Sequence, residues 1–226
     1  MRIVLAGALV WGCSFASAEI HQPFNGQNLD NWDVKKQKQG SKWIVAAPKM
    51  SESNARTLEV DKGNEAMVNV VSGHRQSVDI YTREKFGSAL IEVELMVPKG
   101  ANSGIYVMGE YEVQVLDSFG KAKLGGGDMG AIYGAAPPRV NACKKPGEWQ
   151  KYIIDFQAPR FDATGKKIAN AKFIKVELNG QVLHEHVEMK GPTPAGVSGK
   201  ESAKGPLMFQ GDHGPVAYRN IKITER

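Results

Sequence analysis

Apolar and polar residues alternate along several short stretches of the chain, a period of two that is typical of half-buried β-strands. In the clearest stretch, residues 89–97, Ile91 and Val93 alternate with Glu92 and Glu94. A proline and a glycine follow soon after this stretch and are expected to end it. The pattern predicts a strand with one face toward a core and the other toward solvent.

Similar runs, separated by turn residues, predict about ten short strands and no long helix. The strongest local signal is Asn179-Gly180, because both central residues of a type I′ turn need positive φ and this pair adopts it at little cost. The turn is expected to join a strand over 172–178 to one over 181–189. The other expected strands cover residues 42–46, 56–60, 104–108, 111–116, 149–156, 207–210 and 216–224. We therefore expect an all-β fold, a two-sheet antiparallel β-sandwich of the jelly-roll type with a groove for a sugar chain.

The composition is that of one globular domain. The 226 residues are 42% hydrophobic and 23% charged, with a net charge of +5, which is too apolar and too balanced for a disordered chain. Sandwiches often run to roughly 200–250 residues as one unit, so we expect a single domain over residues 19–226. The lysines are scattered and no recognition motif accompanies them, so nucleic acid is not an expected partner.

Residues 1–18 have the pattern of a signal peptide. Arg2 precedes an apolar run that ends at Trp11, and small residues at Ala16 and Ala18 suit cleavage before Glu19. The run is too short to cross a bilayer core of about 30 Å as a helix, so no integral membrane span is expected. We therefore expect a secreted or periplasmic protein.

Cys13 allows a different N-terminal processing, in which a lipid is attached to this cysteine. It follows Gly12, but Trp11 is bulky for that kind of cleavage site. Cleavage before Glu19 would instead remove Cys13 and leave Cys143 as the only cysteine, so that no intrachain disulfide could form. The fold must then be stabilised by its core.

The segment YEVQVLDS is the first candidate for chemistry. If Val113 and Val115 face the core, Glu112 and Gln114 lie together on the opposite face. Asp117 stands at the end of this strand, where a β-bulge would bring it onto the same polar face. The alternative is that these are ordinary solvent-facing residues of an antiparallel strand.

The segment GDHGPV is the second candidate. Histidine titrates near neutral pH, so His213 suits proton transfer or metal binding, and Asp212 could orient its ring. The alternative is a turn histidine that is bonded to the backbone. Tyr133 in GAIYG and Arg160 in APRFD are candidate contacts for sugar hydroxyls, and either could instead be structural.

Several segments, taken in order, resemble successive motifs of the 3-keto-disaccharide hydrolase family. They are FNGQNLDNW, FGSALIEVELMVPKGANSGIYVMGEYEVQVLDS, GAIYGAAPPRVNACKKPGEWQKYIIDFQAPRFD, NGQVLHEHVEM and GDHGPVAYRNI. The resemblance covers nearly all of residues 19–226. It implies a concanavalin A-like jelly roll, export in bacteria, and glycoside substrates that carry a ketone at C3 of the sugar.

The chemistry of such a substrate assigns roles to the motif residues. The ketone acidifies the hydrogen on C2 and lets the glycosidic oxygen on C1 leave by elimination, after which water completes a net hydrolysis. Under this hypothesis Glu112, Gln114 and Asp117 bind or position a divalent metal that holds the enolate oxygen, and Gln114 also contacts substrate. His213 is the base or a further ligand, and Glu112 and Asp117 share the catalysis. Oxygen ligands favour Ca²⁺, Mg²⁺ or Mn²⁺, and no organic cofactor is expected.

Two other functions are compatible with the sequence. A laminarinase-type glycosidase uses the strand motif E-x-D-x-x-E, and Glu112, Gln114 and Asp117 have its spacing, with an amide in the middle and a shorter last acid. Retaining hydrolysis also needs two carboxyls about 5–5.5 Å apart. A non-catalytic carbohydrate-binding module would carry aromatic platforms, but the tryptophans form no spaced stripe along one strand.

Overall fold

The structure is a computed structural model that describes residues 18–36 and 40–226. Apart from Ala18, the expected signal peptide and its alternative at Cys13 lie outside these residues. No helix in the described part of the chain is long and apolar enough to cross a membrane. The strands are β1 (Glu19–His21), β2 (Trp32–Val34), β3 (Trp43–Met50), β4 (Leu58–Asn69), β5 (Ile80–Thr82), β6 (Ala89–Met96), β7 (Asn102–Val107), β8 (Tyr111–Leu116), β9 (Gln150–Gln157), β10 (Arg160–Phe161), β11 (Lys167–Ala169), β12 (Lys172–Leu178), β13 (Gln181–Glu188), β14 (Met208–Phe209) and β15 (Val216–Glu225).

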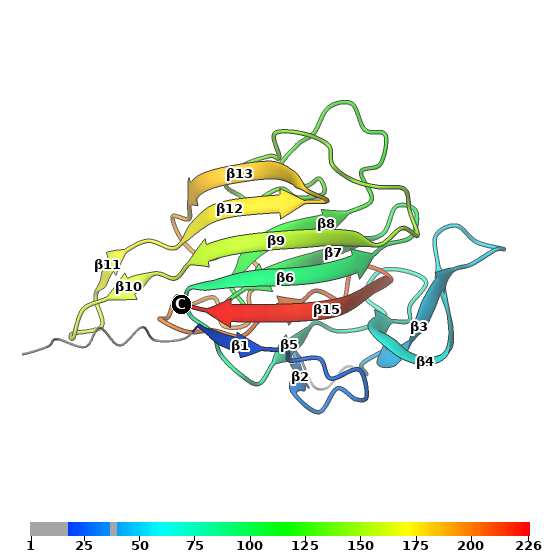
Figure 1. The fold of residues 1–226 in the computed structure, drawn as a ribbon, viewed down its shortest axis with the longest axis horizontal. Coiled ribbons are helices and arrows are strands. Elements are labelled where there is room, and N and C mark those ends of the chain that lie inside the picture. Colours follow the sequence, from blue (N-terminus) through cyan, green and yellow to red (C-terminus); the bar gives the residue numbers. More distant parts are fainter. Residues whose placement is uncertain (1–17, 37–39) are drawn as a thin grey trace, which may run out of the picture.

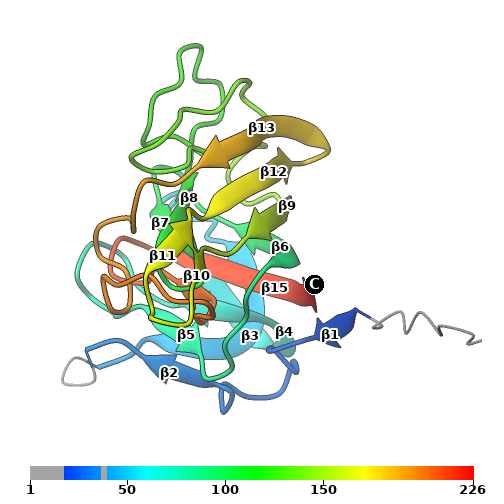
Figure 2. The same ribbon diagram turned by 90° about the vertical axis from the view of Figure 1, so that its left-hand side faces the viewer.

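The strands form two antiparallel sheets packed face to face and a separate two-stranded ribbon (Figures 1 and 2). The larger sheet has the order β13-β12-β9-β6-β15-β4-β3, and β1 pairs with β15. The smaller sheet has the order β2-β5-β14-β7-β8, and the ribbon pairs β10 with β11. The expected all-β, two-sheet antiparallel sandwich of the jelly-roll type is confirmed.

Several of the longer strands lie where the alternation of the sequence placed them, but β3 and β4 extend well beyond the expected 42–46 and 56–60. β8 and β12 have the expected bounds, and the strand expected over 89–97 is β6, one residue shorter. Asn179 and Gly180 have positive φ angles of 52° and 80°, as the predicted turn requires. The strands that the sequence pattern did not show are β1, β2, β5, β10 and β11, which have at most three residues each. A period of two cannot be recognised over so short a run.

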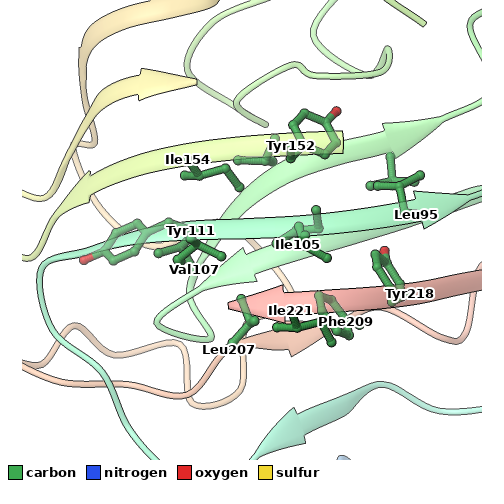
Figure 3. Close-up of a cluster of buried hydrophobic side chains, with 14 of the residues drawn as sticks. Leu95, Ile105, Val107, Tyr111, Tyr152, Ile154, Leu207, Phe209, Tyr218 and Ile221 are labelled. Atoms are coloured by element: carbon green, nitrogen blue, oxygen red, sulfur yellow. The ribbon is translucent and has the colours of Figure 1, made fainter. Parts of the chain in front are cut away.

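The core lies between the inner faces of the two sheets, as Figure 3 shows. Phe209 of β14 stacks on Tyr218 of β15, with ring centroids 3.8 Å apart and ring planes 6° from parallel. Trp32 of β2 also stacks on Phe209, at 5.3 Å. Fully burying one side chain of this size contributes roughly 1.5–3 kcal/mol. The stack therefore joins β14, the neighbour of β7, to the larger sheet.

β7 and β8 form a hairpin whose register decides which side chains reach the core. Gly104 pairs with Gln114, and Tyr106 pairs with Glu112. Because residues directly opposite each other share a face, these four lie on one side of the hairpin. Ile105 and the valines of β8 lie on the other side and are fully buried. The alternation expected for residues 111–116 is thereby confirmed.

Replacing Phe209 with alanine should lower the free energy of unfolding by about 3–5 kcal/mol, because it removes the ring that packs on Trp32 and Tyr218. Urea denaturation followed by tryptophan fluorescence measures the loss. The control is Ile168→Ala in the ribbon, where the side chain is 58% exposed. It should change stability by less than about 0.5 kcal/mol. Equal losses for the two variants would contradict this account of the core.

Candidate active site

Two polar side chains of β8 lie on the outer face of the smaller sheet and are nevertheless shielded from solvent. Glu112 is 4% exposed and Gln114 is 6% exposed. An ordinary solvent-facing strand leaves such groups in water, because burying a carboxylate costs free energy. The outer face of β8 is therefore a covered polar surface.

The Glu112 carboxyl lies over Gly104 of the neighbouring strand. A Cβ added at residue 104 would stand 2.3 Å from Glu112 Oε1 and 3.1 Å from the ring of Tyr106. Any side chain at position 104 would therefore require the Glu112 carboxyl to move. The Tyr106 hydroxyl lies beside the same carboxyl and donates a hydrogen bond of 3.2 Å to the Pro194 carbonyl. Two residues of β7 thus contact the Glu112 carboxyl: Gly104 lies under it and Tyr106 lies beside it.

Burial raises the pKa of Glu112 to about 7, because the ionised carboxyl is poorly solvated in this position. The Tyr106 hydroxyl and the charge of His213 lower this pKa, whereas the charges of Asp79 and Asp212 raise it. A carboxyl with a pKa near 7 is divided between its acid and base forms at neutral pH. Such a group suits general acid–base catalysis.

The loop between β14 and β15 has its path fixed by buried contacts. The Asn69 side-chain amide donates to the carbonyls of Gly211, at 2.7 Å, and Gly214, at 2.9 Å. The Gly211 N–H donates to Asp79 Oδ1 at 3.0 Å, and this glycine has no room for a side chain. These contacts hold the chain on both sides of His213.

Asp212 and His213 form a hydrogen-bonded pair in this loop. His213 Nδ1 lies 2.5 Å from Asp212 Oδ1. This bond is the largest cause of the raised pKa of His213 and of the lowered pKa of Asp212. A carboxylate on Nδ1 leaves Nε2 as the nitrogen that can meet a substrate. The His74 ring packs edge-on against His213, with centroids 4.3 Å apart.

A hollow of about 350 Å³ opens beside His213. Lys36, His74 and Arg75 line it next to His213, together with the Asp212 carboxylate. Side chains with several N–H donors suit the hydroxyl and carbonyl oxygens of a saccharide. This hollow is therefore the candidate position for a substrate at the His213 loop.

The chain over residues 193–199 is fastened across the outer face of the β7–β8 hairpin. Thr193 N–H donates to the Glu110 carbonyl, and the Thr193 hydroxyl accepts a hydrogen bond from Glu112 N–H at 3.1 Å. The buried Glu110 carboxylate accepts from both the backbone N–H and the hydroxyl of Ser198, each at 2.7 Å. Figure 2 shows this part of the chain, in orange, outside β7 and β8. The 193–199 segment thereby helps to shield Glu112.

The structure places Gln114 and Tyr133, the expected substrate contacts, near Glu112. Gln114 lies on the same face of β8, and its side-chain oxygen accepts a hydrogen bond of 3.1 Å from Val115 N–H. The Tyr133 N–H donates to the Glu112 carbonyl. The Tyr133 side chain is 41% exposed and lines a hollow of about 400 Å³ at the edge of β8. Tyr133 thus borders the candidate site, and Gln114 lies within it.

Asp117 does not lie with Glu112, contrary to the sequence-based expectation. The pairing of β7 with β8 runs along the whole strand without the bulge that would have turned Asp117 onto the polar face. Five residues of extended chain span about 16 Å. The Asp117 carboxyl accepts hydrogen bonds from the backbone N–H groups of Gly100 and Phe119. It therefore belongs to a turn at the far end of β8.

Arg160 also lies outside the candidate site, so the structure does not bring it together with Glu112 or His213. It is exposed in β10 and pairs with Ala169 of β11. Figure 1 shows this ribbon at one end of the molecule, whereas β15, which follows the His213 loop, begins at the other end. The pairing of two short strands carries Arg160 away from the sandwich.

Two residues of the site were missed by the sequence analysis. Tyr106 pairs with Glu112, and the alternation of β7 was the signal that could have found it. Asp79 is 7% exposed, and burial raises its pKa. Lys35 Nζ lies 3.5 Å from the Asp79 carboxylate and also donates to the Ala195 carbonyl. No local pattern marks Asp79, because it precedes a strand of only three residues.

A further hollow, of about 490 Å³, lies on the outer face of the larger sheet and is lined by Phe24, Glu92 and Lys151 among others. Lys151 Nζ lies 2.7 Å from Glu92 Oε2, and this bond is the main cause of the lowered pKa of Glu92. The carboxylate therefore stays ionised at neutral pH and is a poor proton carrier. We place the candidate active site at Glu112 for this reason.

The fold defines the class of two-sheet jelly-roll proteins. The sequence narrows this class to one family. The chain belongs to the family of 3-keto-α-glucoside-1,2-lyase-like domains, whose sequence profile matches residues 20–224. The resemblance to 3-keto-disaccharide hydrolases is thereby confirmed.

Solved structures from Parabacteroides distasonis, each described as a candidate glycosyl hydrolase, share the fold. One is 30% identical, with a TM-score of 0.69, and the match covers 93% of this chain and 84% of that chain. Another is 16% identical, with a TM-score of 0.60 and coverages of 92% and 94%. A third is 20% identical, with a TM-score of 0.58 and coverages of 92% and 100%. A search of curated proteins found no match.

Glu112→Gln should stabilise the protein in a pH-dependent way. Below a pH of about 4.5 the carboxyl is protonated in the folded and the unfolded chain, so stability should be similar in the two proteins. Between this pH and about 7 only the unfolded carboxyl ionises. The wild type should therefore lose up to about 3 kcal/mol relative to the variant, and the difference should then level off.

Urea denaturation at pH values from about 4 to 8 measures this difference. Glu92→Gln is the control with the opposite sign, because the pKa of Glu92 is lowered in the folded protein. That variant should be less stable than the wild type by a constant amount above the unfolded pKa of about 4.5, and the difference should shrink as the pH falls below that value. A pH-independent difference for Glu112→Gln would show that Glu112 ionises normally.

Proposed function

We propose that the protein is an exported enzyme that cleaves the glycosidic bond of glycosides oxidised to a ketone at C3. The family to which the chain belongs supports this substrate class. The similarity to candidate glycosyl hydrolases supports action on a glycosidic bond. The single observation that carries the proposal is the shielded Glu112 carboxyl. Burial raises its pKa to about 7, and the charge of His213 acts on the same carboxyl.

The reaction needs one group that removes a proton and one that supplies a proton. Burial raises the pKa of Glu112, and the bond to Asp212 raises the pKa of His213. Near neutral pH an ionised Glu112 and a protonated His213 can therefore coexist as base and acid. Each charge favours the other, because His213 lowers the pKa of Glu112 and Glu112 raises that of His213.

With the C3 ketone in place, ionised Glu112 takes the proton from C2, and the electron pair passes into an enolate. The enolate then forms the C1=C2 double bond as the bond from C1 to the glycosidic oxygen breaks. His213 gives its proton to the departing oxygen. Lys36 and Arg75 of the hollow beside His213 provide positive charge near the enolate oxygen. Addition of water across C1=C2 turns this elimination into a net hydrolysis.

The divalent metal expected at Glu112, Gln114 and Asp117 does not fit the structure as one shared ligand set. Asp117 is bonded in a turn at the far end of β8, and the Gln114 oxygen accepts the Val115 N–H. We therefore assign the proton transfers to Glu112 and His213 and derive no step through a metal ion.

The structure disfavours the laminarinase-type alternative. Retaining hydrolysis needs two carboxyls about 5–5.5 Å apart. The two acids of the motif, Glu112 and Asp117, are separated by about 16 Å of extended strand. A binding module without catalysis needs no proton-transfer group, and an activity assay separates that alternative from an enzyme.

Glu112→Gln and His213→Ala should each lower kcat for a 3-keto-glucoside by about 10²–10⁴-fold, because each removes a proton-transfer group. Release of the alcohol is the measurement, with the unmodified glucoside as a second substrate. The wild type should cleave only the keto form, and Arg160→Ala in the ribbon should match it. Full activity of His213→Ala, or equal cleavage of both substrates, would contradict the proposal.

Asp212→Asn should move the alkaline limb of the pH profile of kcat/KM to lower pH. Asp212 is the largest cause of the raised pKa of His213, so its neutral replacement lets His213 lose its proton earlier. The acid limb, set by Glu112, should move less, since Asp212 is the smallest of the causes that act on Glu112. Asp117→Asn, which alters a distant turn, is the control. An unchanged alkaline limb in Asp212→Asn would remove His213 as the acid.

A further inference from the structure

Glu19, His21 and Glu225, remote from the candidate active site, bring together side-chain atoms that can bind a metal ion. One nitrogen or oxygen atom of each lies within 4.8 Å of the others. β1 pairs with the end of β15, with Glu19 opposite Glu225 and His21 opposite Ile223 (Figures 1 and 2). Residues two apart in a strand, and residues directly opposite each other, share a face. The three side chains therefore lie on one face.

His21 has the surroundings of a metal-binding histidine. Its Nδ1 lies 2.9 Å from Glu84 Oε1, and its ring packs edge-on against Phe86 at a centroid distance of 5.1 Å. A carboxylate on one ring nitrogen keeps the proton there and turns the lone pair of the other nitrogen toward a metal. That other nitrogen, Nε2, is buried and has no hydrogen-bond partner among the described residues. Glu19 Oε1 is 3.8 Å from it.

The negative charges of this cluster would also be stabilised by a bound cation. Glu19 and Glu225 stand directly opposite each other, and like charges in that position destabilise a strand pair. Lys204 Nζ lies 2.6 Å from Glu225 Oε1, and Gly87 N–H donates to the same oxygen. These two contacts do not involve Oε2. One lysine thus faces a group of three carboxylates, counting that of Glu84.

We propose that Glu19, Nε2 of His21 and Glu225 bind a divalent cation that fastens β1 to β15. One imidazole and two carboxylates suit Zn²⁺ better than Ca²⁺, which takes oxygen ligands only. The ion gives the buried nitrogen a partner and offsets the two facing glutamates. β1 has three residues and pairs only with β15 among the described strands, so the ion would strengthen a short attachment.

Titration calorimetry of the chelator-treated protein with ZnCl₂ tests the proposal. One zinc ion should bind per chain, more tightly than Mn²⁺. His21→Gln, which keeps a polar side chain but loses the imidazole, should abolish binding. Glu84→Gln should weaken binding by about 10–100-fold, because it only orients the ring. Zinc should raise the Tm of the wild type and leave that of His21→Gln unchanged.

Two further variants separate this site from other zinc sites. Glu112→Gln should bind zinc as the wild type does, because its carboxyl lies on the other sheet. Lys204→Met should bind zinc more tightly, since it removes the ammonium group that competes for Glu225. Circular dichroism of each metal-free variant checks that it is folded. An unchanged zinc affinity in His21→Gln, a lost affinity in Glu112→Gln, or a wild type that binds no zinc would overturn the proposal.

Discussion

Burial of the apolar face of the β7–β8 hairpin against the larger sheet sets the positions of Glu112, Gln114 and Tyr106 at the candidate site. Ile105 and Val113 are fully buried, and their pairing leaves one register in which both face inward. A slip of one residue would expose the valines and drive Glu112 into the apolar core. The apolar burial that stabilises the sandwich therefore also keeps the carboxyl on the outer face, and no separate contact is needed for this.

Shielding of this face costs free energy, and hydrogen bonds from the neighbouring segments offset that cost. The covering that keeps water from Glu112 also disfavours its ionised form, which is why its pKa lies near 7. Hydrogen bonds from the 193–199 segment to Glu110, and from Lys35 to Ala195, hold the covering in place. The protein thus maintains a poorly solvated carboxyl with bonds that lie outside the reacting groups, as is common where function and stability make different demands.

The sequence predicted those features that depend on local pattern. The sandwich, the Asn179-Gly180 turn and the division of β8 into apolar and polar faces all follow from alternation and turn chemistry over a few residues. The errors lie where tertiary contacts decide. Asp117 was placed by spacing, but a continuous register carries it away from Glu112. Asp79 could not be found, because only the pairing of β5 with β14 brings it to the site. The position of Arg160 likewise depends on a ribbon of very short strands, which no sequence pattern showed.

The close contact of the Glu112 carboxyl with Gly104 couples two positions that lie eight residues apart. The effect of a substitution at one of them therefore depends on the residue at the other. A side chain at position 104 would displace the Glu112 carboxyl from its shielded position. A shorter side chain at 112 would free position 104 to vary. Laboratory libraries that vary both positions together can therefore reach combinations that libraries of one position alone do not contain.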